Sequence, residues 1–175
     1  MSPAYLKQAP TGVPGDVTRV DESNVEPAML VPLAGVFPTA YGIPMKYVVG
    51  AAGQPNGIQQ FSGGEAATVF AGVLVREVPS EAGSTTSDTQ YTPTAPLGTQ
   101  VNGFLVRGYI SVLCTLGTPA RGGTVYIQTS AGGSTSIGDF QATSTANNTA
   151  LTATQAEWAS DGVDANLNAE LRVAR

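Results

Sequence analysis

The spacing of glycine and proline is the feature that most constrains how this chain can fold. Among its 175 residues are 21 glycines and 12 prolines, and they recur every few residues between short apolar runs. Proline breaks a helix interior and glycine weakens one, so long helices are excluded. Hydrophobic residues still make up 42% of the chain, which is too apolar for disorder. We therefore expect a mainly-β domain, a compact β-barrel or sandwich of short antiparallel strands.

Several runs have the length and composition of strands. Residues 104–114 alternate, with the even-numbered side chains from Phe104 to Cys114 on one face and the odd-numbered ones on the other. Residues 69–75 form a continuous apolar run typical of a strand buried on both faces. Further strands are expected at residues 45–50 and 58–61, joined by a turn, and at residues 124–129, 137–140 and 169–173. The loop at residues 117–123 predicts an antiparallel hairpin between 104–114 and 124–129. Residues 153–158 are the best helix candidate, but they are short and rich in threonine.

The chain divides into two parts by composition. Residues 1–27 contain four prolines and hardly any periodic apolar pattern, so we expect an extended N-terminal arm that gains order by lying on another surface. Residues 28–175 form the predicted β domain. Within it, residues 80–98 are rich in Ser, Thr, Pro and Gly, which predicts a long loop and a contact element.

Composition argues against most kinds of catalysis and cofactor binding. The chain has no histidine, and its single cysteine, Cys114, lies in an apolar run that predicts an unreactive core thiol. Asp161 and Asp164 lack the spacing of a calcium loop, and nothing brings Asp139 and Glu157 together as a catalytic pair. We therefore predict no enzyme activity, no catalytic residue, no metal site and no cofactor.

Charge and hydropathy also limit the partners. The net charge is -5 and no stretch concentrates Lys or Arg, so direct nucleic-acid binding is not expected. No apolar run approaches the roughly 20 residues that span a bilayer, and the N-terminus lacks the pattern of a signal peptide. We expect the protein to be made in the cytoplasm and not to bind membranes.

Candidate interface residues remain. Arginines within or beside apolar strands are either ion-pair and interface residues or solvent-facing strand positions. The scattered tyrosines suit core or interface packing better than a sugar platform. The candidates come from the arm, the long loop and the strands: Tyr5, Leu6, Pro10, Val13, Arg76, Tyr91, Arg107, Tyr109 and Arg121.

The order of several motifs resembles a known family. The run Phe70-Ala71-Gly72-Val73-Leu74-Val75-Arg76 is similar to a Phe-x-Gly-Val-x-Val-Arg strand. Arg107-Gly108-Tyr109-Ile110-Ser111-Val112, followed by residues 117–127, is similar to an Arg-Gly-Tyr-x-x-Val and Gly-x-Pro-x-x-Gly-x-Val-Tyr hairpin, and Ile137-Gly138-Asp139-Phe140 matches the next strand. In this order, over residues 28–175, the chain resembles the structural cement (decoration) proteins of tailed-bacteriophage capsids.

The resemblance implies a subunit that binds the outer surface of a phage head and bridges neighbouring major capsid protein subunits. It also implies self-association, as a dimer or trimer. An alternative is another virion or surface-binding module, such as a tail or fibre-base subunit or a glycan-binding decoration domain.

Overall fold

The computed structural model describes residues 12–48, 57–76, 101–132 and 135–174. These residues form ten strands and two short 3-10 helices, which confirms the mainly-β class. The elements are η1 (Val20–Glu22), β1 (Asn24–Leu30), β2 (Pro44–Tyr47), β3 (Gly57–Gln60), η2 (Ala67–Val69), β4 (Phe70–Leu74), β5 (Val101–Leu116), β6 (Tyr126–Gln128), β7 (Phe140–Gln141), β8 (Asn148–Ala150), β9 (Ala156–Trp158) and β10 (Asn168–Ala174).

Five of the strands close into a barrel in the order β1-β3-β2-β4-β5, with β5 pairing back to β1. The β1–β3 pairing is parallel and the other pairings in the barrel are antiparallel. The barrel interior holds one apolar cluster, made of Ala28, Leu30, Met45, Ile58, Ala71, Leu74, Phe104 and Val106. Closure leaves the barrel strands without a long free edge, which limits unwanted strand pairing.

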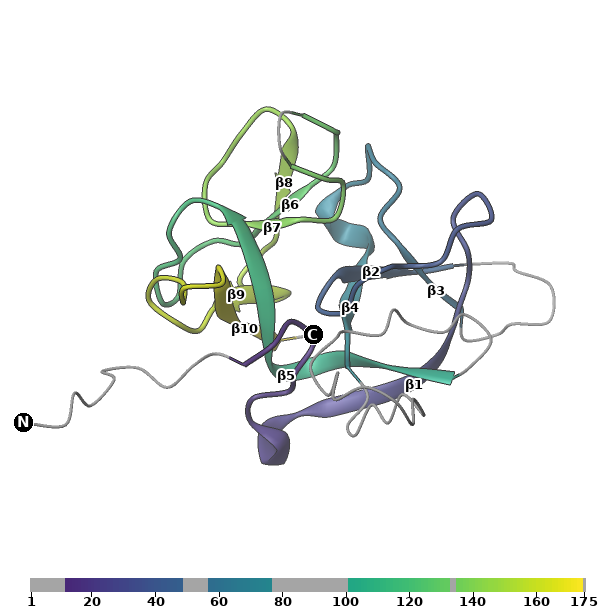
Figure 1. Ribbon diagram of the computed structural model, residues 1–175, viewed down its shortest axis with the longest axis horizontal. Coiled ribbons are helices and arrows are strands. Elements are labelled where there is room, and N and C mark those ends of the chain that lie inside the picture. The colour runs from purple at the N-terminus through teal and green to yellow at the C-terminus, as the bar shows by residue number, and fades with distance from the viewer. Residues whose placement is uncertain (1–11, 49–56, 77–100, 133–134, 175) are drawn as a thin grey trace, which may run out of the picture.

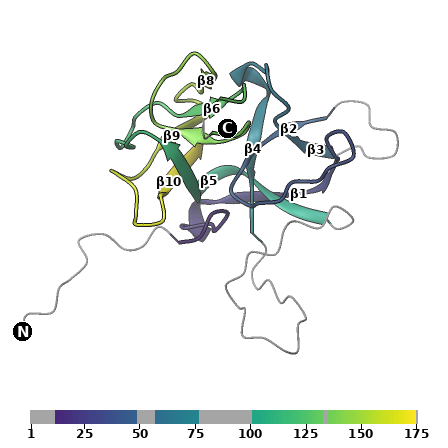
Figure 2. The same cartoon turned by 45° about the horizontal axis from the view of Figure 1, so that its top comes forward.

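A second layer packs beside the barrel and is built on the other half of β5. There β5 pairs with β10, which continues to β9, and it pairs in parallel with β7, which leads to β6 and β8. In Figure 1, β5 runs along the base of the barrel and then turns upward into this layer. The turned view in Figure 2 again places β6 and β8 above β9 and β10, with the barrel strands to the other side. A larger apolar cluster lies between the two layers and contains the buried Trp158, Phe140 and Leu171.

Gly108 is the point where β5 changes layers. Its φ is +125°, which an L-residue rarely adopts. The pairing of β1 with β5 shifts register just before it, between Asn24 opposite Arg107 and Val25 opposite Leu105. On the barrel side of this bend Phe104 and Val106 enter the barrel core, whereas Ile110 and Val112 join the second core. The even-numbered residues from Phe104 to Cys114 are all buried, as the alternation predicts, but they divide between two cores and do not form one continuous face.

The N-terminal segment is part of this sheet from residue 15 onward. The Gly15 and Thr18 N–H groups donate to the carbonyls of Ser111 and Tyr109, at 2.8 and 3.0 Å, and β1 then continues along the first half of β5. The predicted boundary between residues 27 and 28 falls inside β1. From residue 15 onward, the segment therefore lies on the chain's own β5. Residues 1–11 lie outside the described residues.

The local strand predictions fare better than the pairing predictions. Strands form within or close to residues 45–50, 58–61, 69–75 and 169–173, and the first two pair as expected. The predicted hairpin is wrong, because β6 pairs with β7 and β8 and not with β5. The strand expected at 137–140 begins only at Phe140, and the helix candidate contains strand β9. Residues 80–98 lie outside the described residues.

Candidate interaction surface

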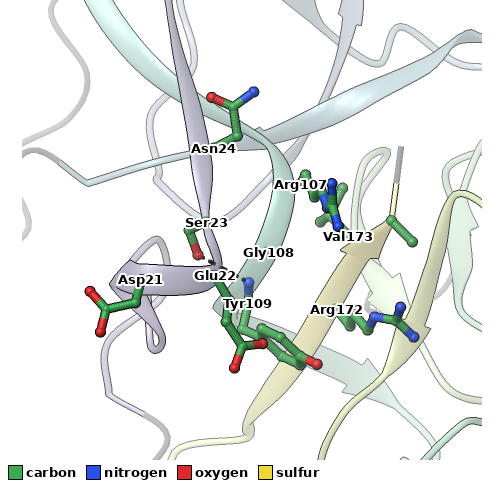
Figure 3. Close-up of a pocket in the computed structure, with 10 residues that line it drawn as sticks. Asp21, Glu22, Ser23, Asn24, Arg107, Gly108, Tyr109, Arg172 and Val173 are labelled. Atoms are coloured by element: carbon green, nitrogen blue, oxygen red, sulfur yellow. Dashed lines mark hydrogen bonds between the residues drawn. The ribbon is translucent and has the colours of Figure 1, made fainter.

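A polar groove of about 580 Å³ opens where the N-terminal segment, β5 and β10 meet. Asp21 and Glu22 of η1 line one side, and Arg107 of β5 and Arg172 of β10 line the other. Figure 3 shows the two carboxylates on the side of η1, with the arginines across from them and the Tyr109 ring between. We call this feature the charged groove. Its two sides carry opposite charges.

Hydrogen bonds to Ser23 hold the acidic side in place. The Ser23 hydroxyl donates to the Arg19 carbonyl at 2.6 Å and accepts from the Tyr109 N–H at 3.4 Å. This serine sits directly over Gly108, where an added Cβ would lie 2.2 Å from its Oγ. The absence of a side chain at residue 108 therefore allows η1 to pack against β5.

A second set of contacts lies beside the groove on the same face. The Arg19 guanidinium donates from Nη2 and Nε to both Glu170 oxygens, at 2.9 and 3.3 Å, and lies 3.8 Å from the centre of the Tyr109 ring. The hydrogen bond with Glu170 raises the pKa of Arg19. Thr18 also donates to Glu170 at 2.6 Å. These contacts attach the N-terminal segment to β10 through charge and through the aromatic face.

The two arginines of the basic side differ: Arg172 forms an ion pair, whereas Arg107 forms none with a described residue. Arg172 donates to Glu157 at 2.6 Å, and this hydrogen bond raises the pKa of Arg172. Arg107 is exposed and forms no ion pair within the described ranges, and the same holds for Asp21 and Glu22. Within the described ranges, three exposed charges of the groove therefore have no ion-pair partner.

The predicted interface residues separate into different places. Arg107 and Tyr109 both line the charged groove. Arg121 lies on the exposed loop before β6 and is 3.8 Å from Asp161, with both side chains mostly exposed. Val13 is half-buried, and its N–H donates to Asp16 at 3.0 Å. Tyr5, Leu6, Pro10 and Tyr91 lie outside the described residues.

Arg76 differs from the other arginines because it is buried. Only 9% of the residue is exposed, its guanidinium lies 5.9 Å from the centre of the Tyr41 ring, and its Nε has no hydrogen-bond partner in the described part of the chain. Its backbone N–H donates to the Gly15 carbonyl at 2.9 Å. Arg76 thus contacts the N-terminal segment and lies away from the charged groove.

Sequence reasoning missed Asp21, Glu22 and Arg172 as members of the groove. Arg172 falls in the strand expected at residues 169–173, and the two acids fall in the arm expected at residues 1–27, but none of the three was a candidate interface residue. The available signal was the presence of Arg107 and Tyr109 in a strand of otherwise apolar character. It could have pointed to the groove only if the pairing of residues 15–18 with β5 had been known.

The described residues contain little that resembles a catalytic or metal site. Asp161 accepts the Arg121 N–H and Asp164 accepts the Asn166 N–H, both at 2.8 Å, as capping groups do in turns. No group of three or more His, Cys, Asp or Glu side chains comes together within these ranges. Cys114 is buried, and burial raises the pKa of its thiol. Among the described residues, no helix is both long and apolar enough to cross a membrane.

The fold and this surface define a β-barrel protein that presents a groove lined by opposite charges. The sequence profile of the XM1 gp53 minor capsid protein family matches residues 2–172. The chain belongs to this family, which makes it a minor structural component of a phage capsid. The resemblance to phage capsid structural proteins is thereby confirmed.

A solved structure shares the fold. A chain in "The capsid of Myoviridae Phage XM1" superposes with a TM-score of 0.60 at 18% sequence identity, covering 97% of this chain and 94% of that chain. At this identity the likeness establishes the fold. A search of the curated proteins found no match.

Proposed function

We propose that the protein is a cement subunit that binds the outer surface of the phage head and stabilises contacts between neighbouring major capsid protein subunits. The observation that carries this proposal is the family match, because it extends over residues 2–172 and so includes the barrel, the second layer and the N-terminal segment. A capsid role for the whole chain follows from membership. The cement role adds a location, the outer surface of the head, and a partner, the major capsid protein.

Charge favours the outer surface over the inner one. The chain carries 13 acidic and 8 basic side chains and no histidine, for a net charge of -5. A protein of this charge is repelled by packaged DNA, whose phosphates attract basic surfaces. Binding outside the shell avoids this repulsion.

The architecture suits a part that must resist strain. The strand β5 belongs to both the barrel and the second layer, so the two layers share one continuous hydrogen-bonded backbone. Pulling them apart would break β5 pairings with β10 or with β1 and β4, together with the core between the layers. A rigid body of this kind can transmit load between two shell subunits without unfolding.

Self-association would strengthen attachment. Two or three linked subunits, each bound to a shell site, dissociate far more slowly than one because the second binding event is intramolecular. We therefore include a homo-oligomer in the proposal. No enzymatic activity is needed for this role.

Adding the purified protein back to heads that lack it tests the proposal. Sealed, DNA-filled heads should bind the protein from solution, at a copy number comparable to that of the major capsid protein by quantitative mass spectrometry. Bound heads should release DNA at a higher temperature than bare heads. A control protein of similar size and charge should neither bind nor shift the release temperature.

Two outcomes would contradict the cement role. Failure to bind sealed heads, although the protein is present in virions made in the cell, would place it inside the shell. Recovery of a few copies only in the tail fraction would favour a tail or fibre-base subunit instead.

A further inference from the structure

We propose that the charged groove is the contact surface of a twofold dimer, in which the acidic side of each copy packs against the basic side of the other. This inference specifies the self-association included in the proposed function, and it does not depend on binding to the head. The acidic side, which we call the acidic ridge, is the helix η1, whose Asp21 and Glu22 line the groove and whose first residue, Val20, lies beside it in the chain. The opposing cation is Arg107 of β5.

The unpaired charges make the groove a docking surface. Asp21, Glu22 and Arg107 are all exposed, and none forms an ion pair with a described residue. Among the described residues, the other three arginines with an exposed or half-buried side chain are Arg19, Arg121 and Arg172, and each faces a carboxylate within 4 Å. Arg107 is therefore the exception among the exposed and half-buried arginines that the structure describes.

An exposed apolar side chain accompanies the acids. Val20 is 75% exposed, the highest exposure among the large hydrophobic residues of the described chain. The opposite side of the groove ends in Val173 and Ala174 of β10. Val173 is itself buried in the core, so the half-buried Ala174 is the apolar residue of that end that Val20 could contact, with the charges pairing around it as in interfaces with an apolar centre and a polar rim.

The placement of both charges in one groove favours a second copy as the occupant. In a twofold contact the same patch meets itself, so the patch must carry complementary groups of its own. A ring, in contrast, joins two different patches on opposite sides of the subunit. Here the acidic ridge and Arg107 line the same groove, which is the arrangement that a twofold axis requires.

Charge reversal tests this pairing directly. One variant is Arg107→Glu, and the other is the double substitution Asp21→Lys with Glu22→Lys. Either variant by itself places like charges at both contacts of the twofold dimer. It should raise the dimer dissociation constant at least about tenfold, as measured by sedimentation equilibrium of the full chain. An equimolar mixture of the two variants should form a heterodimer, because each contact then joins opposite charges again.

Two controls keep the result interpretable. Arg121→Glu changes an exposed arginine of similar type outside the groove and should leave dimerisation unchanged. Thermal unfolding of each variant, followed by the fluorescence of Trp158, shows whether the chain still folds. Combining all three substitutions in one chain should restore the homodimer.

Several results would overturn the inference. A wild-type chain that stays monomeric at all concentrations, or forms trimers, contradicts a twofold dimer. A dimer that tolerates both reversals, or variants that fail to pair when mixed, places the contact elsewhere. A monomer whose binding to heads is lost with Arg107→Glu would assign the groove to the shell protein, leaving the cement role intact.

Discussion

Replacing Gly108 by alanine should weaken the fold more than almost any other addition of one methyl group. The residue has a φ of +125°, and a Cβ there would lie 2.2 Å from the Ser23 Oγ and 2.6 Å from the Ser23 Cα. Real Cβ atoms do not approach other atoms so closely. The backbone of Ser23 must therefore move, and η1 with it.

The cost has two parts. Holding a residue with a side chain in such a backbone conformation costs about 1–3 kcal/mol. Moving Ser23 also breaks the hydrogen bond that its hydroxyl donates to the Arg19 carbonyl at 2.6 Å, which contributes about 1 kcal/mol. We expect Gly108→Ala to lower the free energy of unfolding by about 2–4 kcal/mol, a large share of the 5–15 kcal/mol of a typical domain.

Urea unfolding measures this loss, with Trp158 as the probe. It is the single tryptophan of the chain and is 1% exposed in the core between the layers, so its fluorescence reports loss of that core. Gly122→Ala is the matched control, because Gly122 has a φ of +73° and nothing within 4 Å of its added Cβ. The control should lose only about 1 kcal/mol. Equal losses in the two variants would refute the proposed packing of Ser23 on Gly108.

Three further predictions concern single side chains. Burial alone would raise the pKa of Glu65, but hydrogen bonds from Lys46, Ser62 and Gly63 lower this pKa from 4.5 to about 2. The contribution of Glu65 to stability is therefore complete above pH 4.5 and is lost as the pH falls toward 2. Glu65→Gln should therefore remove about 1–2 kcal/mol of stability at neutral pH and flatten the acid limb of a pH–stability curve measured by urea unfolding. Cys114 should react with a thiol reagent such as DTNB only at the rate of unfolding, because it is 2% exposed, and rapid reaction of the native protein would contradict its burial. Arg19→Ala removes the contacts with Glu170 and Tyr109, so it should lower the free energy of unfolding by about 1–2 kcal/mol and make the N-terminal segment more sensitive to limited proteolysis. Unchanged cleavage would show that those contacts are not needed to hold the segment on the sheet.

The elements that the sequence predicted well are those whose signal is local. The run around β4 is apolar throughout, and every residue of that strand is buried. Strand β10 alternates in sequence and in burial, with Leu171 and Val173 inside and Arg172 outside. In both cases the pattern of side chains is enough, because each strand must bury its apolar face whatever its neighbours are.

Pairing could not be predicted in the same way because distant residues decide it. The loop after β5 is long enough for a hairpin, but the Gly122 N–H donates to the Trp158 carbonyl at 2.7 Å and the Arg121 N–H donates to Asp161. These contacts lead the chain toward β9, so β6 ends beside β7 and β8. No local feature of residues 117–123 shows this.

The charged groove contains residues that a local sequence signal identifies and residues whose position depends on long-range pairing. Arg107 and Tyr109 were recognised from the sequence because an arginine and a tyrosine are unusual in an otherwise apolar strand. Asp21 and Glu22 were not, since their position depends on the bend at Gly108 and on the pairing of residues 15–18 with β5. Long-range register of this kind leaves little trace in a single sequence.

The N-terminal segment shows how the fold limits the experiment that would test its role. A deletion of residues 1–27 removes Val17, the strand start at Asn24 and the hydrogen bonds to Ser111 and Tyr109, so it should cost several kcal/mol and leave most of the chain unfolded. A deletion of residues 1–11 removes none of the contacts that the structure describes, and the Gly12 carbonyl can still accept from Asn168. We expect this shorter deletion to keep the urea midpoint of the full chain and to lower retention on heads challenged with heat. Equal retention would exclude residues 1–11 from binding the head, and a stable fold after the longer deletion would show that the barrel closes without the first half of β1.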